Sequence, residues 1–173
     1  CTLSAFNLGA IESLDELEGL ADLAVRALDS LLDYQDYPIP AAKNASLARR
    51  TLGIGVINYA YYLAKNGLYY SNGSANNLTH RTFESIQYYL LKATNLLAKE
   101  QGACPKFNET RLSQGILPID TYKRTIDDIT GEPLHLDWES LRASIVKYGV
   151  RNSTVSALMP SETSSQISNA TNG

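Results

Sequence analysis

The sequence predicts an α/β fold, because extended and helical segments alternate along the chain. Residues 13–33 and 77–98 carry apolar side chains at helical spacing, whereas residues 51–57 and 153–159 are short β-branched and apolar runs typical of buried strands. Elements that alternate in this way pack in layers around one core. A chain of 173 residues, 44% of them hydrophobic, has the size of one domain and enough apolar surface for such a core.

The first part should be an extended segment followed by a helix. Residues 1–9 are extended, and Ser13 and Glu16 then have the spacing of a capping box. An amphipathic helix, acidic outside and leucine-lined inside, should run from there to about residue 33. The two prolines in residues 37–40 should end it and begin an extended connection.

The strand predicted at residues 51–57 contains two glycines, Gly53 and Gly55. A Gly-x-Gly pair invites comparison with a dinucleotide-binding turn, but Asn58 stands where the third glycine belongs and no acidic partner follows. We therefore reject that motif. Glycines inside a strand more often allow another backbone to approach closely.

The second part should be mainly helical. Residues 58–66 should form one helix and residues 77–98 a long one, whereas residues 101–128 carry several glycines and prolines and should be irregular. Asp137 should cap a further helix, which ends at residue 149. A strand over residues 153–159 then completes the α/β pattern.

Charge and cysteine content exclude several classes of function. A net charge of −3 with mixed signs gives no basic footprint for nucleic acid, and no apolar run is long enough for a membrane span. Two cysteines make no disulfide framework, which favours a reducing cytoplasm. His80 and His135 lack partners at metal-ligand spacing, so we expect no metal site.

The strongest local signal is a candidate anion-binding turn after the last predicted strand. Residues 165–168 can enter a helix, and N–H groups at a helix start attract anions. The alternative interpretation is an ordinary N-cap rich in Ser and Thr. The residues of this turn are Pro160, Ser161, Glu162, Thr163 and Ser164.

Five segments of the chain resemble one family in the same order. That family is the large catalytic subunit of class I ribonucleotide reductases, in its bacterial and phage form, and the resemblance spans essentially the whole chain. The segments are residues 1–9 (CTLSAFNLG), 36–43 (DYPIPAAK), 49–56 (RRTLGIGV), 115–122 (GILPIDTY) and 160–173 (PSETSSQISNATNG).

The resemblance implies a fold and two kinds of site residue. Residues 1–173 would be a partial catalytic barrel domain, incomplete at both ends and roughly the second half of a ten-stranded α/β barrel. The turn from Pro160 to Ser164 would bind the substrate phosphates. Cys1 would be one half of a redox dithiol whose partner lies upstream. Without the resemblance, Cys1 reads as an ordinary thiol, and Cys104 as a small buried hydrophobe.

The resemblance also implies an activity and its partners. The family reduces ribonucleoside diphosphates to 2′-deoxyribonucleoside diphosphates by radical chemistry, for DNA precursor synthesis. A metal-containing small subunit supplies the radical, thioredoxin or glutaredoxin reduces the dithiol, and ATP and dNTP effectors bind outside this segment. This chain would hold no cofactor. The radical-bearing finger loop should precede Cys1, so the chain alone should be inert.

Two other readings remain open from the residues alone. In the first, the chain is a non-catalytic α/β module that binds phosphorylated ligands. In the second, it is a non-functional remnant. Glu162 likewise has three readings: a proton donor, a ribose contact, or a carboxylate favoured by the helix dipole.

Overall fold

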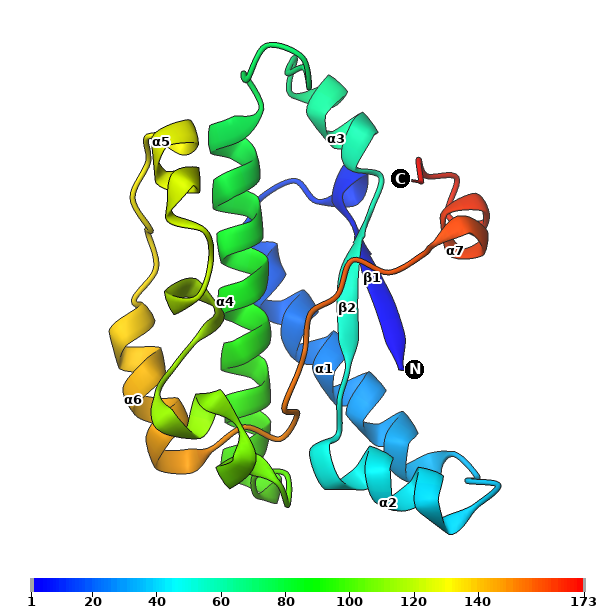
Figure 1. The fold of residues 1–173 in the computed structure, drawn as a ribbon. Coiled ribbons are helices and arrows are strands. Elements are labelled where there is room, and N and C mark those ends of the chain that lie inside the picture. Colours follow the sequence, from blue (N-terminus) through cyan, green and yellow to red (C-terminus); the bar gives the residue numbers. More distant parts are fainter. Residues whose placement is uncertain (1, 173) are drawn as a thin grey trace.

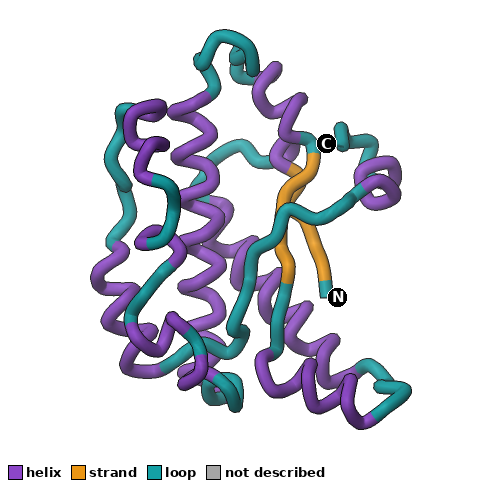
Figure 2. Tube along the Cα trace, viewed as in Figure 1, coloured by secondary structure: helices purple, strands orange, loops and turns teal. Residues whose placement is uncertain are grey.

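The computed structural model describes residues 2–172, and its sheet contains two parallel strands (Figures 1 and 2). Strand β1 (Leu3–Asn7) pairs with β2 (Gly53–Ile57) in a register that sets Leu3 against Gly53 and Asn7 against Ile57. The connection between them runs through α1 (Glu16–Tyr34) and α2 (Pro40–Arg49). Parallel strands need such a crossover, so the predicted α/β class is confirmed.

The other elements follow β2 and are helical. Helix α4 is the longest, and short 3-10 turns occupy much of the segment between α4 and α6. The remaining bounds are α3 (Tyr59–Lys65), α4 (Asn76–Gln101), α5 (Asp127–Thr130), α6 (Trp138–Tyr148) and α7 (Glu162–Ile167), with 3-10 turns at Leu8–Ala10, Phe107–Glu109, Arg111–Gln114, Pro118–Asp120 and Arg124–Ile126.

The strand expected at residues 153–159 does not form as a regular strand. The segment lies parallel to β2, but its only bridge joins Ser156 to Ile54. The N–H groups of Leu52 and Ile54 donate to the successive carbonyls of Thr154 and Val155, at 2.8 and 2.9 Å. In a regular parallel ladder these two N–H groups would donate to carbonyls two residues apart. The hydrogen-bond register between this segment and β2 is therefore irregular.

Helix α2 is the second difference from the sequence-based expectation, which placed an extended connection there. Its first residue is Pro40, whose fixed φ suits the start of a helix and whose missing N–H costs nothing there. One half of the capping box predicted for helix α1 is formed, because the Glu16 carboxylate accepts the N–H of Ser13 at 2.9 Å.

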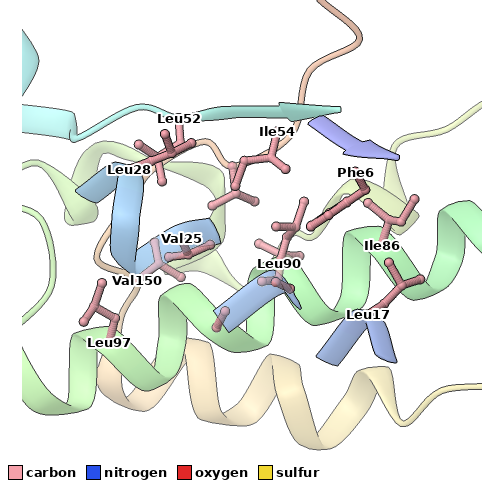
Figure 3. Close-up of a cluster of buried hydrophobic side chains, with 14 of the residues drawn as sticks. Phe6, Leu17, Val25, Leu28, Leu52, Ile54, Ile86, Leu90, Leu97 and Val150 are labelled. Carbon is pink, nitrogen blue, oxygen red and sulfur yellow. The ribbon is translucent and has the colours of Figure 1, made fainter. Parts of the chain in front are cut away.

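The hydrophobic core lies between the strands and the two long helices. Figure 3 shows Phe6 and Ile54 on the strands facing Leu17 of α1 and Leu90 of α4. All four side chains are buried. Burial of a side chain of this size stabilises the fold by roughly 1.5–3 kcal/mol, so this layer is what fixes α1 and α4 on one face of the sheet.

A buried polar network closes the amino end of the strands. Arg50 donates to both Asp29, at 2.7 Å, and Asp33, at 2.7 and 2.9 Å. Asn152 donates to Asp29 at 2.8 Å and accepts from Thr94 at 2.9 Å. These contacts join α1, the end of α2, α4 and the segment beside β2, so they fix the helices at this end.

Across residues 2–172, none of the helices has the length and apolar character that crossing a lipid bilayer requires.

Candidate functional site

The candidate site lies at the carboxyl end of the strands, the edge where parallel α/β folds bind ligands. Asn7 ends β1, and Asn58 comes directly after β2. Helix α7 lies near this end, and Figure 1 places it on the opposite side of the strand pair from α4. The turn predicted from sequence is therefore close to the edge where a ligand site is expected.

Asn58 joins three segments at this edge. Its backbone is left-handed, with φ of 66°, and its side chain is buried. The side-chain amide donates to Oδ1 of Asn7 at 2.9 Å. Its own Oδ1 accepts the N–H of Thr171 at 2.9 Å, and its backbone N–H donates to the carbonyl of Thr171 at 2.9 Å. The chain after α7 is thereby held against both strand ends.

The segment that carries the turn also closes on itself. Ser161 is buried, and its hydroxyl donates to Oδ1 of Asn172 at 2.9 Å. Within the segment, the N–H of Ser165 donates to the carbonyl of Ser161 at 2.9 Å, and the N–H of Ala170 to that of Ser165 at 2.8 Å. The turn is thus the first part of a small closed loop, with α7 between its two ends.

Helix α7 begins at Glu162, three residues earlier than the sequence suggested. The N–H groups of its first three residues, Glu162, Thr163 and Ser164, meet no acceptor anywhere in residues 2–172. Ser161 occupies the N-cap position, but its side chain makes no cap hydrogen bond. The ordinary Ser/Thr cap is therefore not formed, and the helix start presents free donors.

The side chains of the turn differ in how they are engaged. The Ser164 hydroxyl donates to the carbonyl of Ser161 at 3.2 Å, whereas Glu162 and Thr163 are exposed and form no side-chain hydrogen bond with the described part of the chain. Pro160 is exposed as well and precedes the N-cap. Backbone groups, more than hydroxyls, are what this turn offers to an anion.

The two strand glycines have the role predicted for them. A Cβ on Gly55 would collide with the carbonyl oxygen of Ala157, and a Cβ on Gly53 would meet Leu3 at 2.6 Å. Neither glycine has a positive φ. They are needed for close packing, because the backbone leading to the turn passes directly over β2.

The cysteines and histidines add nothing to the site that the structure describes. Cys1, the predicted redox residue, lies outside the described residues. Cys104 is a buried free thiol, as predicted, and burial raises its pKa. The Nδ1 atom of His135 lies 3.4 Å from Oε2 of the buried Glu84. Within residues 2–172, no cluster of three His, Cys, Asp or Glu side chains is placed to hold a metal ion.

A large cavity in the described residues lies elsewhere. Its volume is about 530 Å³, and it lies between α4 and the irregular segment before α6, with Phe83, Ile119 and Trp138 among its mostly apolar lining. None of the turn residues lines it. Size alone would select this cavity, whose lining includes His80, and the buried Nε2 atom of His80 has no hydrogen-bond partner within residues 2–172. We place the candidate site at the strand ends instead, because the turn predicted from the sequence lies there.

Sequence reasoning missed the two asparagines that organise the site. Asn58 entered only as the residue that breaks a glycine motif, and Asn7 was not singled out. The signal was nevertheless present, because each asparagine stands at the carboxyl end of a parallel strand. Polar residues at that position are candidates for a functional edge.

Comparison with known proteins gives one consistent result. The family model described as "Ribonucleotide reductase, barrel domain" matches residues 1–173. The chain is 78% identical over 173 residues to the ribonucleoside-diphosphate reductase subunit alpha of Haemophilus influenzae, covering 100% of this chain and 23% of that protein.

Two further relatives have similar names. The ribonucleoside-diphosphate reductase 1 subunit alpha of Escherichia coli is 78% identical over 142 residues, which cover 82% of this chain and 19% of that protein. The subunit alpha of Enterobacteria phage T4 is 51% identical over 175 residues, which cover 100% of this chain and 23% of that protein. The chain thus spans less than a quarter of the length of these curated relatives.

Proposed function

Because the chain belongs to the ribonucleotide reductase barrel-domain family, we propose that it works as part of a ribonucleoside-diphosphate reductase alpha subunit. Such a subunit reduces ribonucleoside diphosphates to 2′-deoxyribonucleoside diphosphates. Identities of 78% and 51% over the whole chain, to proteins with that name, support this function over a separate phosphate-binding module. We place this activity in the cytoplasm, in keeping with the low cysteine content.

We propose further that the chain supplies roughly the second half of a ten-stranded α/β barrel. The parallel pair β1 and β2, with residues 153–157 running parallel beside β2, is the arrangement of adjacent barrel strands. In residues 2–172, β1 has a strand neighbour on one side only. Its other edge has free N–H and C=O groups to which the next barrel strand can pair.

The turn from Pro160 to Ser164 is the proposed site for the substrate diphosphate. One observation carries this assignment: the free N–H groups of Glu162, Thr163 and Ser164 lie at the carboxyl end of parallel strands. N–H donors in this arrangement stabilise a phosphate without any basic side chain. The Glu162 carboxylate is repelled by phosphate, and its exposed position lets it turn toward the ribose or away.

Cys1 is proposed as one of two thiols that reduce the substrate. In this step the 2′-hydroxyl leaves as water, the two thiols give up two electrons and two protons, and a disulfide forms. Thioredoxin or glutaredoxin then returns the disulfide to the dithiol. The small subunit supplies the radical, and the nucleotide effectors bind outside this chain. The contribution of this chain is therefore one reducing thiol and the phosphate turn.

The test of the phosphate turn uses a complete alpha subunit that contains this chain. Ser161→Ala and Ser164→Ala should each weaken binding of the ribonucleoside diphosphate about twofold to tenfold, because each loses an internal hydrogen bond that shapes the turn. Thr163→Pro should weaken it more, since it removes one of the free N–H groups. Equilibrium dialysis or calorimetry measures the dissociation constants.

Two controls decide the result. Ser168→Ala alters an exposed serine at the far end of the same helix and should leave binding unchanged. A nucleoside without phosphates should bind the parent and all variants alike. Unchanged diphosphate binding in Ser161→Ala, Ser164→Ala and Thr163→Pro would show that the turn does not bind phosphate.

A further inference from the structure

We propose that Asn58 is a positioning residue for the phosphate turn, holding it in the one place where its N–H groups face the substrate. The proposal rests on the proposed function of the Pro160–Ser164 turn. It assigns to Asn58 no contact with the substrate, because its polar atoms are already used by Asn7 and Thr171.

Within residues 2–172, Asn58 alone connects the loop to the rest of the protein by hydrogen bonds. Between residues 158–172 and residues 2–157, three hydrogen bonds are formed, and Asn58 takes part in all of them. Two are at 2.9 Å and join Asn58 to the backbone of Thr171 in both directions, and the third is donated by the Thr171 hydroxyl at 3.3 Å. Within residues 2–172, every hydrogen bond that holds the loop at the strand edge therefore involves this one residue.

Asparagine is the residue type that position 58 needs. Its left-handed backbone disfavours most residues but is tolerated by Asn and Gly. Oδ1 of Asn7 already accepts the N–H of Gly9 at 3.1 Å, so the side chain at position 58 must donate to it. The other end of that side chain must accept the N–H of Thr171. An amide meets both demands, whereas a carboxylate would place a second acceptor against Asn7.

The glycine at position 9 leaves space for the side-chain amide of Asn58. A Cβ on Gly9 would collide with the side-chain nitrogen of Asn58. Gly9 has no positive φ, so its backbone conformation does not require glycine. A Cβ would also meet the ring of Tyr61 at 2.7 Å, so the close approach of both Asn58 and Tyr61 is the physical reason for glycine at position 9.

Loss of the Asn58 side chain should lower the fraction of molecules whose turn is in place. Apparent affinity falls in proportion to that fraction. Two hydrogen bonds between Asn58 and Thr171 use its side chain, so we expect the dissociation constant and the KM for the diphosphate to rise about tenfold. The kcat should stay within about twofold, because within residues 2–172 the side chain of Asn58 forms hydrogen bonds only with Asn7 and Thr171.

The experiment compares Asn58→Gly with a matched substitution, Asn169→Gly, in a complete alpha subunit that contains this chain. Glycine keeps the left-handed backbone in both variants. Asn169 also has a positive φ, of 50°, but it is exposed and its side chain makes no hydrogen bond within residues 2–172. The dissociation constants of a ribonucleoside diphosphate and of the corresponding nucleoside are measured for each, together with KM and kcat.

We expect Asn58→Gly to weaken diphosphate binding about tenfold, with the nucleoside unaffected, and Asn169→Gly to match the parent. Gly9→Ala, which displaces the Asn58 amide without removing it, should change the constants in the same direction. It provides the test if Asn58→Gly does not fold. A Gly9→Ala protein with parental diphosphate affinity then contradicts the proposal.

Other outcomes separate this proposal from the function it rests on. If Ser164→Ala weakens diphosphate binding and Asn58→Gly does not, the turn binds phosphate but Asn58 does not position it. If Asn58→Gly weakens nucleoside and diphosphate equally, or lowers kcat with unchanged KM, its role is structural only and the proposal is overturned. If neither variant affects diphosphate binding, the phosphate turn itself is wrongly assigned.

Discussion

A residue with a left-handed backbone flanks each end of strand β2, but the two residues form different kinds of contact. Arg50, with φ of 48°, precedes the strand, and its buried guanidinium binds two carboxylates. Asn58, with φ of 66°, follows the strand and makes only neutral hydrogen bonds. The amino end uses paired charges, whereas the carboxyl end avoids them.

The two ends of β2 differ in whether their hydrogen-bond donors have acceptors within the described chain. At the amino end the donors of Arg50 and Asn152 find acceptors, and the result is a rigid closure. At the carboxyl end the first N–H groups of α7 stay without acceptors in the described chain. A phosphate that approaches them would be repelled by a fixed carboxylate, so neutral amides are the better scaffold there. Barrel folds show a similar division between a stability end and a binding end, which agrees with the phosphate site that we propose.

The largest effect should come from breaking the amino end. Asp29→Ala removes the buried carboxylate to which the Arg50 guanidinium and the Asn152 amide both donate, which should cost roughly 3–5 kcal/mol of unfolding free energy. Asp22→Ala is the matched control on the same helix, because the Asp22–Arg26 pair is partly exposed and such pairs are worth about 0.3–0.5 kcal/mol. Denaturant unfolding of the complete subunit measures both. A penalty for Asp29→Ala no larger than that for Asp22→Ala would remove the proposed contrast.

A smaller effect is expected where the chain passes between the two ends. Gly55→Ala would force apart β2 and the backbone of Ala157, because the new methyl meets a carbonyl oxygen. Overpacking of this kind costs roughly 1–3 kcal/mol. Gly19→Ala, on an open face of α1, is the control and should be neutral or slightly stabilising. Unfolding midpoints test the pair, and a neutral Gly55→Ala would mean that this crossing is loose.

The comparison also shows which parts of the structure the sequence could predict. Helices α1 and α4 were predictable because their apolar residues recur along one face, and the strand glycines because their spacing pointed to close packing. Helix α2 was missed because its two nearby prolines read as a break, although Pro40 is its first residue. The residue pattern of 153–159 gave no sign that this segment pairs irregularly with β2.

The phosphate role of Pro160 to Ser164 was predicted from the local order of residues and from the family resemblance, and it stays a prediction. The contact of Asn58 with Thr171 was not predicted, because the two residues are 113 apart in sequence. Contacts of such range depend on the fold, so the sequence could mark Asn58 only by its place at the carboxyl end of a strand.

The smallest effect, and the sharpest difference between the two ends, should appear in the dependence of stability on pH. A hydrogen bond from Arg50 holds the pKa of Asp33 below its ordinary value of 3.8. Because the pKa is lower in the folded state, the pair contributes stability above pH 3.8, and this contribution is lost as the pH falls through the lower, folded-state pKa. Asp33→Asn should therefore cost stability near neutral pH, and the cost should fade in that acid range.

Asn58→Gly should behave differently, because neither Asn58 nor its partners Asn7 and Thr171 titrate. Its stability penalty relative to the parent should stay constant over the same pH range. Unfolding midpoints of the parent and both variants, measured from about pH 7 to about pH 3, test the contrast. Since the Asp33 side chain is 56% exposed, solvent screens its pair with Arg50 and the effect should be small. A constant penalty for Asp33→Asn would mean that the charge of Asp33 contributes nothing to the amino end, leaving Asp29 alone to hold Arg50.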